Sequence, residues 1–143
     1  MPDPRRHAEE PVCRLGCLVL VRDVRGDVLL VDPDHLDGLI LPGGGARPDE
    51  APHEAAARHL FAQTGLVRRL THVLALDFAC ADRYPQRLGL VFDGGVTGGR
   101  PAGARFVPVR RIGQVMAPAQ AARVTQALTG RAVPLLLHGQ RAA

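Results

Sequence analysis

The chain has 143 residues, 46% of them hydrophobic, with 16 glycines and 12 prolines, and this composition predicts one turn-rich globular domain rather than a disordered segment. Its formal net charge is +4 and all 18 basic residues are arginines, but these arginines are not interleaved with aromatic residues, which argues against nucleic-acid binding. The longest apolar run, Leu15 to Val21, is too short to span a membrane and no signal peptide is recognisable, so we expect a soluble, cytoplasmic protein.

The first third of the chain predicts a hairpin followed by a glycine-rich loop. Residues 1–11 are polar and contain three prolines, so they are predicted to be a flexible tail. Residues 12–22 and 28–31 read as buried strands, and the turn residues between them predict a hairpin. Residues 39–41 are predicted to be a short strand that leads into the glycines.

A helix is predicted directly after the glycine-rich loop. Ala51 is the expected N-cap and Pro52 the first helical residue, where a missing N–H is tolerated. Glu54 is expected to reach back to the cap and to pair with Arg58 four residues later. Gly65 is expected to end the helix in the left-handed conformation. The stripe predicted to face the core contains Ala56, Ala57, Leu60 and Thr64.

The second half of the chain predicts two long strands, then short elements and a second helix. Residues 70–78 and 87–92 read as strands joined by a loop over residues 80–86. The elements predicted after them are a glycine-rich turn region from residue 93, a strand over 104–107, one or two helical turns over 109–115, a helix over 118–128 and a short strand over 133–137.

Charge is unevenly distributed along the chain. Residues 1–93 hold all 14 acidic residues and 11 arginines, whereas residues 94–143 hold seven arginines and no acidic residue. This pattern is typical either of a basic outer surface or of a positive field that favours a phosphorylated ligand.

The three cysteines show no paired spacing of the kind that metal sites use. Cys13 and Cys17 lie four residues apart in a predicted strand, which places them roughly 13 Å apart at ~3.3 Å per residue. They therefore cannot bridge each other or share a zinc ion. We expect them and Cys80 to be small core residues of a protein in a reducing compartment.

The stretch from Leu41 to Leu66 resembles the Nudix box, in which Gly, five residues, Glu and seven residues precede Arg-Glu-aliphatic-any-Glu-Glu-any-Gly-aliphatic. Six of the nine fixed positions match, namely Gly44, Glu50, Arg58, Leu60, Gly65 and Leu66. The resemblance spans residues 12–137 and implies an α/β/α sandwich, with a mixed sheet, the box helix on one face and a C-terminal helix on the other. Residues 1–11 and 138–143 would then be tails.

The three glutamates that follow Arg58 in the family are absent. Residues at i, i+3 and i+4 share one helix face, so these positions would converge on one metal site. The resemblance implies Mg²⁺ or Mn²⁺ there, but the chain has His59, Ala62 and Gln63. Ala62 offers no ligand, Gln63 offers a neutral oxygen, and a histidine suits softer ions. The sequence therefore indicates that the magnesium site has been lost.

Several residues remain candidates for chemistry at the site. Glu50 and His59 are candidate catalytic groups, although the resemblance implies a structural partnership of Glu50 with Arg58. A residual metal site would use Glu50, Glu54 or Gln63. The candidates for ligand binding are Gly43, Gly44, Gly45, Arg47, Arg58, Asp77 and Tyr84, because glycines let the main chain approach an anion beside a helix N-terminus and arginines supply positive charge.

Three functional hypotheses follow. The first is a Nudix-fold protein with an impaired pyrophosphohydrolase site that binds a nucleotide-like or other small anionic ligand. The second is a divergent but active hydrolase of nucleoside diphosphate derivatives, with its metal on Glu50, Glu54, Asp77 or His59. The third is metal-independent acid–base chemistry by His59 or His53, since histidine titrates near neutrality. A homodimer is compatible with the sequence.

Overall fold

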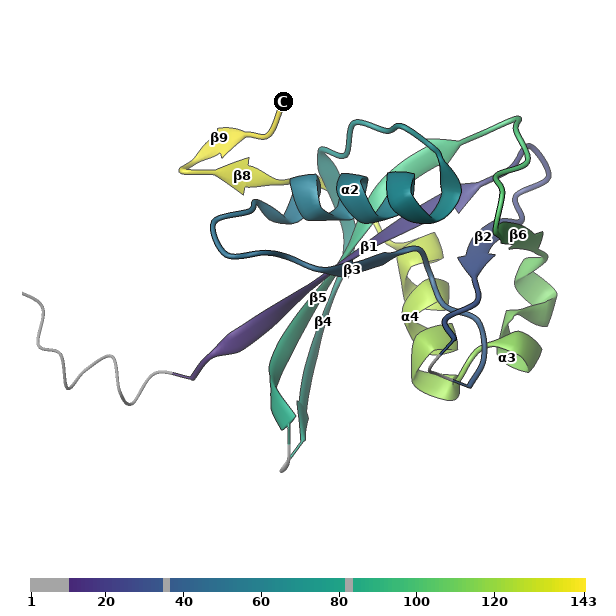
Figure 1. Cartoon of the computed structure of the whole chain (residues 1–143), viewed down its shortest axis with the longest axis horizontal. Coiled ribbons are helices and arrows are strands. Elements are labelled where there is room, and N and C mark those ends of the chain that lie inside the picture. Colours follow the sequence, from purple (N-terminus) through teal and green to yellow (C-terminus); the bar gives the residue numbers. More distant parts are fainter. Residues whose placement is uncertain (1–10, 35–36, 82–83) are drawn as a thin grey trace, which may run out of the picture.

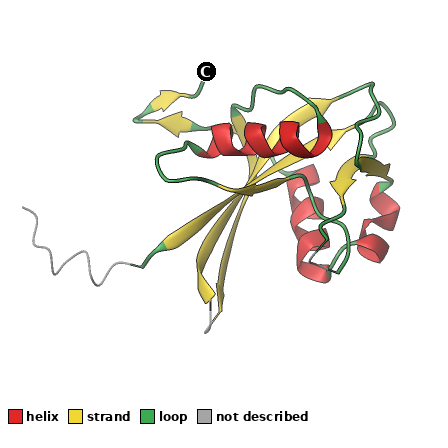
Figure 2. Cartoon of the chain, viewed as in Figure 1, coloured by secondary structure: helices red, strands yellow, loops and turns green. Residues whose placement is uncertain are grey.

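The computed structural model describes residues 11–34, 37–81 and 84–143, and at residues 81, 84 and 85 it describes the main chain alone. A central sheet is covered on one face by helix α2 (Pro52–Thr64) and on the other by α3 (Ile112–Val115) and α4 (Pro118–Thr129), as Figures 1 and 2 show. This arrangement confirms the predicted α/β/α sandwich. The predicted tail over residues 1–11 lies almost wholly outside the described residues.

The main sheet is mixed. Its strands run in the order β6-β2-β1-β5-β4-β7, with β3 also paired to β1. β1 and β5 are parallel, and the other pairs are antiparallel. The strands are β1 (Cys13–Arg22), β2 (Val28–Val31), β3 (Gly43–Gly45), β4 (His72–Ala81), β5 (Tyr84–Val96), β6 (Ala104–Val107) and β7 (Val133–Pro134), and a separate hairpin contains β8 (Leu136–Leu137) and β9 (Gln140–Arg141).

Strand β1 explains why both faces of the sheet are apolar. Successive side chains of a strand point to opposite faces, so Val19 and Val21 pack under α2 beside Leu60, whereas Leu18 and Leu20 pack on the side of α4. A strand buried on both faces belongs in the middle of a sheet, and β1 lies between β5 on one side and β2 and β3 on the other.

Helix α2 begins and ends as predicted. Ala51 is the N-cap, Pro52 opens the helix, and Gly65 closes it with φ of 76°. The predicted roles of Glu54 are wrong, because Glu54 points to solvent and Arg58 turns to Glu50 instead. The helix face buried against the sheet consists of Ala55, Ala56, Leu60 and Thr64, with Ala57 half-buried.

Two predicted boundaries in the middle of the chain are wrong. Residues 39–41 form one isolated bridge, between Val31 and Ile40, and the strand lies in the glycines that follow. Strands β4 and β5 are also longer than predicted, so most of the expected loop over 80–86 and the first residues of the expected turn region belong to the hairpin.

The end of the chain is more structured than predicted. The helical turns (η1, Val109–Arg111, and α3) and helix α4 lie where they were expected. The predicted strand over 133–137 divides into β7, which pairs with β4, and β8, which pairs with β9. The Leu135 N–H still donates to the carbonyl oxygen of Thr71 at 2.8 Å, whereas the Leu135 carbonyl oxygen accepts from Ala142 N–H at 2.9 Å, so the chain changes partners at this residue. Part of the expected C-terminal tail forms β9, and Ala142 is buried.

All three cysteines are free, and only Cys17 is in the core. Cys13 and Cys80 are exposed because β1 and β4 extend beyond the helices that cover the sheet. The prediction of small core cysteines is therefore right for Cys17 alone. No helix in the described part of the chain is both long and apolar enough to cross a bilayer.

Candidate functional site

Glu50 and Arg58 form a bidentate ion pair at the start of the box helix. Arg58 Nε donates to Glu50 Oε2 at 2.8 Å and Arg58 Nη2 donates to Glu50 Oε1 at 2.8 Å. The main-chain N–H of Arg47 also donates to Glu50 Oε1, at 3.0 Å. These bonds hold the turn between β3 and α2 closed, and they engage both carboxylate oxygens of Glu50. The partnership implied by the sequence resemblance is present, and it gives Glu50 a structural role.

The same contacts shift the pKa of both side chains. Hydrogen bonds from Arg58 and from the Arg47 N–H lower the pKa of Glu50 from 4.5 to about 2. The bond to Glu50 raises the pKa of Arg58. Burial, together with the nearby charge of Glu50, raises the pKa of the Cys17 thiol below them to about 11.

The Glu50 pair predicts a specific loss of stability in acid. A carboxyl whose folded-state pKa is depressed contributes stability above its unfolded pKa and loses it as the pH falls through the folded one. Glu50→Gln should therefore be less stable than the wild type at pH 7, and the difference should shrink between about pH 4.5 and pH 2. Urea unfolding across this range is the measurement, with the exposed Glu54→Gln as control. If the difference in unfolding free energy between Glu50→Gln and the wild type does not depend on pH, the ion pair does not lower the pKa of Glu50.

Gln63 is bound to the main chain of Gly43 in both directions. Gly43 N–H donates to Gln63 Oε1 at 3.0 Å, and Gln63 Nε2 donates to the carbonyl oxygen of Gly43 at 3.0 Å. The carboxamide thus bonds to the outer edge of β3 much as a neighbouring strand would. These two bonds use one N–H and one lone pair of the carboxamide.

His59 makes a similar contact with Gly45, two residues further along β3. Its Nε2 lies 2.9 Å from the carbonyl oxygen of Gly45, and because that oxygen can only accept, Nε2 carries the proton. The imidazole also lies against Gly44, where an added Cβ would come within 2.6 Å of the ring. Gly44 therefore leaves the space that the imidazole fills.

Side chains of α2 form hydrogen bonds with the main-chain groups of β3 that point away from β1. His59 and Gln63 donate N–H groups to the carbonyl oxygens of Gly45 and Gly43, whereas glutamates at these positions could only accept. Ala62, between them on the helix, is exposed and brings no ligand atom. Mg²⁺ requires several oxygen ligands. The residues present do not fit the metal that the box implies, and no three His, Cys, Asp or Glu side chains of the described residues form a metal-binding group.

The other acidic candidates do not converge on the box. Asp77 lies on the face of the sheet that α4 covers, where Arg123 Nε donates to its Oδ2 at 2.7 Å. The ion pair between Arg123 and Asp77 connects α4 to β4, and Arg123 also donates to Gln120 Oε1 at 2.7 Å. Arg47 is exposed and contacts Glu50 through its main chain. Tyr84 opens β5, but its side chain lies outside the described part of the structure.

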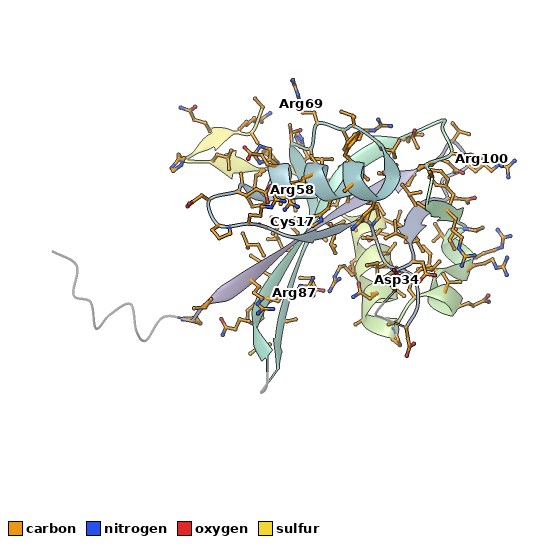
Figure 3. The ribbon with its side chains drawn as sticks, in the orientation of Figure 1. Cys17, Asp34, Arg58, Arg69, Arg87 and Arg100 are labelled. Carbon is orange, nitrogen blue, oxygen red and sulfur yellow. The ribbon has the colours of Figure 1, made fainter. Side chains whose placement is uncertain are left out.

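A row of glycines crosses the sheet beside the box, and of its members only Gly45 was predicted as part of the site. Gly45 of β3 pairs with Gly16 of β1, and Gly16 pairs with Gly89 of β5. The guanidinium of Arg87 lies over this row, since a Cβ on Gly16 would meet Arg87 Nε at 3.0 Å. Arg14 is the neighbour of Arg87 across the strands, and both side chains are exposed (Figure 3 labels Arg87). Gly16 and Gly89 are buried and Gly45 is exposed. We call this row the glycine floor.

The sequence did contain a signal for the glycine floor. Glycine inside an apolar strand weakens it, and it often marks a place where a ligand or another backbone comes close. Gly16 and Gly89 both interrupt apolar strands, Gly16 between Leu15 and Cys17 and Gly89 between two leucines. Their alignment depends on the register between β1 and β5, which one strand alone does not reveal.

Comparison with known proteins identifies the family. The NUDIX domain family matches residues 14–131. The chain belongs to the Nudix family. It is 36% identical over 64 residues to diphosphoinositol polyphosphate phosphohydrolase 2 of Rattus norvegicus, covering 44% of this chain and 36% of that protein. It is 34% identical over 71 residues to diphosphoinositol polyphosphate phosphohydrolase NUDT4B of Homo sapiens, covering 49% and 39%. The match thus spans well under half of either relative.

Solved Nudix structures share the fold at low identity. The MutT protein from Methanosarcina mazei Go1 superposes with a TM-score of 0.68 at 22% identity, covering 82% of this chain and 92% of that one. A NUDIX hydrolase from Nitrosomonas europaea gives 0.68 at 17% identity, covering 88% and 94%. A UDP-X diphosphatase gives 0.62 at 15% identity, covering 90% and 70%. At such identities the likeness supports the fold alone.

Proposed function

We propose that this Nudix-family protein has an impaired magnesium-dependent pyrophosphohydrolase site and instead binds a small anion that contains a pyrophosphate group. One observation carries the proposal. Two residues that replace box glutamates, His59 and Gln63, donate N–H groups to the carbonyl oxygens of Gly45 and Gly43. The outer edge of β3 is thereby held by hydrogen-bond donors and needs no cation.

The argument against magnesium rests on charge. Metal-assisted hydrolysis needs a divalent ion to absorb charge that develops on the phosphate oxygens. Carboxylates hold such an ion, but Glu50 is engaged by Arg58, Asp77 is engaged by Arg123, and these two pairs lie on opposite faces of the sheet. Among the described residues no three His, Cys, Asp or Glu side chains form a metal-binding group, and we expect turnover to fall by several orders of magnitude.

The argument for an anion rests on the glycine floor and its arginines. Arg14 and Arg87 are exposed on neighbouring strands, and Gly45, at the end of the glycine row, is exposed as well and has no side chain to block a ligand. Arginine presents a planar fork of donors that matches phosphate oxygens. The names of the two relatives refer to diphosphoinositol polyphosphates. That class of densely phosphorylated compound suits a floor of this charge.

The other two hypotheses gain no support from the geometry. An active hydrolase would need convergent metal ligands among the described residues. Acid–base catalysis by His59 would need a ring nitrogen that reaches a substrate, but Nε2 is bound to the carbonyl oxygen of Gly45 and the edge of the ring that carries Nδ1 lies against Gly44. His53 is half-buried at the start of α2, and its Nδ1 has no hydrogen-bond partner in the described part of the structure.

A paired assay of turnover and binding tests the proposal. The purified chain is incubated with a panel of nucleoside diphosphate derivatives and inositol pyrophosphates, with Mg²⁺, with Mn²⁺ or without metal. We expect metal-independent binding, weakened in Arg87→Gln and unchanged in the exposed control Arg131→Gln, and no turnover above the protein-free blank. Metal-dependent turnover by the wild-type chain would contradict the claim that the hydrolase site is impaired. Equal binding by both variants would contradict the claim that the anion binds at the glycine floor.

A further inference from the structure

A cavity lies away from the box, at the opposite end of the sheet. It has a volume of about 490 Å³ and is bounded by the β1–β2 turn, the β5–β6 loop and strand β6. Three arginines, Arg25, Arg100 and Arg105, line it from these three segments. Figure 3 shows Arg100 at the end of the molecule away from Arg58 and Arg87. The cavity is therefore separate from the glycine floor.

Arg105 lies where this cavity meets two smaller hollows. It also lines a hollow of about 220 Å³ together with Arg111, and one of about 390 Å³ beside Leu39. Strand β6 is at the end of the sheet and pairs with β2 alone among the described strands. The side chain of Arg105 is exposed along this edge.

The charges around the cavity favour an anion. Asp23 and Asp27 also line it, but Asp23 Oδ1 already accepts the main-chain N–H groups of Arg25 and Asp27, each at 2.9 Å. The ion pairs formed between described residues, Arg58–Glu50 and Arg123–Asp77, involve none of the arginines of this cavity. Three arginines against two aspartates give the lining an excess of positive charge, which attracts an anion.

We propose that this cavity is a second anion site, which takes a phosphate or pyrophosphate group of a small ligand through Arg25, Arg100 and Arg105. Guanidinium groups from three segments can grip the oxygens of such a group from different directions. The volume is within the range of about 300–1,000 Å³ that small-molecule sites occupy. Gly98 and Gly99 line one wall, and their lack of side chains leaves the main chain open to the ligand. The proposal does not depend on the function of the box.

An NMR titration with inorganic pyrophosphate, without metal and at constant ionic strength, tests this site. The amide signals of Gly98 and Gly99 report the cavity, and those of Gly43 and Gly45 report the box separately. We expect saturable shifts at Gly98 and Gly99. The apparent affinity there should fall about tenfold or more in Arg105→Gln, since one charge-assisted hydrogen bond is lost.

Arg110→Gln is the matched control, because Arg110 is exposed just beyond β6 and lines none of the three hollows. Its affinity at Gly98 and Gly99 should equal that of the wild type. Arg100→Gln, in the loop, provides a second test if strand β6 does not tolerate the change at Arg105. Shifts confined to Gly43 and Gly45, or shifts at Gly98 and Gly99 that all variants share equally, would overturn the second site.

Discussion

Replacing Gly43 with alanine is expected to destabilise the fold by about 3 kcal/mol or more, because no relaxation of side chains can make room for the new methyl group. Gly43 has φ of 146°, which L-residues rarely adopt, and an added Cβ would come within 2.3 Å of the Cys17 carbonyl oxygen and 2.7 Å of Leu18 Cα. Both are main-chain atoms of β1. Thermal unfolding should shift downward by roughly 6–12 °C for a domain of this size.

The matched control for Gly43→Ala is Gly113→Ala. Gly113 lies in helix α3, and a Cβ there would meet nothing within 4 Å. Alanine favours a helix over glycine, so this variant should be as stable as the wild type or slightly more stable. Equal melting temperatures for the two variants would mean that β3 does not approach β1 as closely as described.

Replacing Gln63 with glutamate is expected to cost about 1–3 kcal/mol in the absence of metal. The carboxamide donates to the Gly43 carbonyl oxygen at 3.0 Å, whereas a carboxylate would face that oxygen without a proton to share. The variant that restores one family glutamate should therefore unfold at lower denaturant concentration than the wild type.

Ala62→Glu is the control for Gln63→Glu. It introduces the same charge one residue earlier on the helix, but Ala62 is exposed, so its effect should stay within about 0.5 kcal/mol. Equal stability of Gln63→Glu and wild type without metal would show that the bond to Gly43 contributes nothing.

Local rules predicted α2 well, because its signals lie within the helix itself. Pro52 has a fixed backbone angle that suits the first helical position, Gly65 supplies the left-handed cap, and the spacing of Ala56 and Leu60 matches one helix face. The continuous apolar run of β1 predicted a buried strand for the same reason.

Contacts set by tertiary structure were not predictable in the same way. Three glycines in succession do not favour a strand, and β3 forms because β1 and the side chains of α2 satisfy both of its edges. A register shift between Val73 and Ala75 changes which residues of β4 face each helix, and a slip of one residue reverses every face beyond it. This is why the strand pattern alone could not assign Asp77 to the side of α4 and Arg123.

The claim that the box has lost its magnesium site is tested most directly by the effect of Mg²⁺ on the melting temperature. The wild type is compared with the triple variant His59→Glu, Ala62→Glu, Gln63→Glu. An ion that binds only the folded chain stabilises it by about 2.7 kcal/mol at a hundredfold excess over its dissociation constant. We expect no saturable rise in the melting temperature of the wild type. The triple variant should melt lower without metal and recover as Mg²⁺ is added. A saturable rise for the wild-type chain would contradict the account.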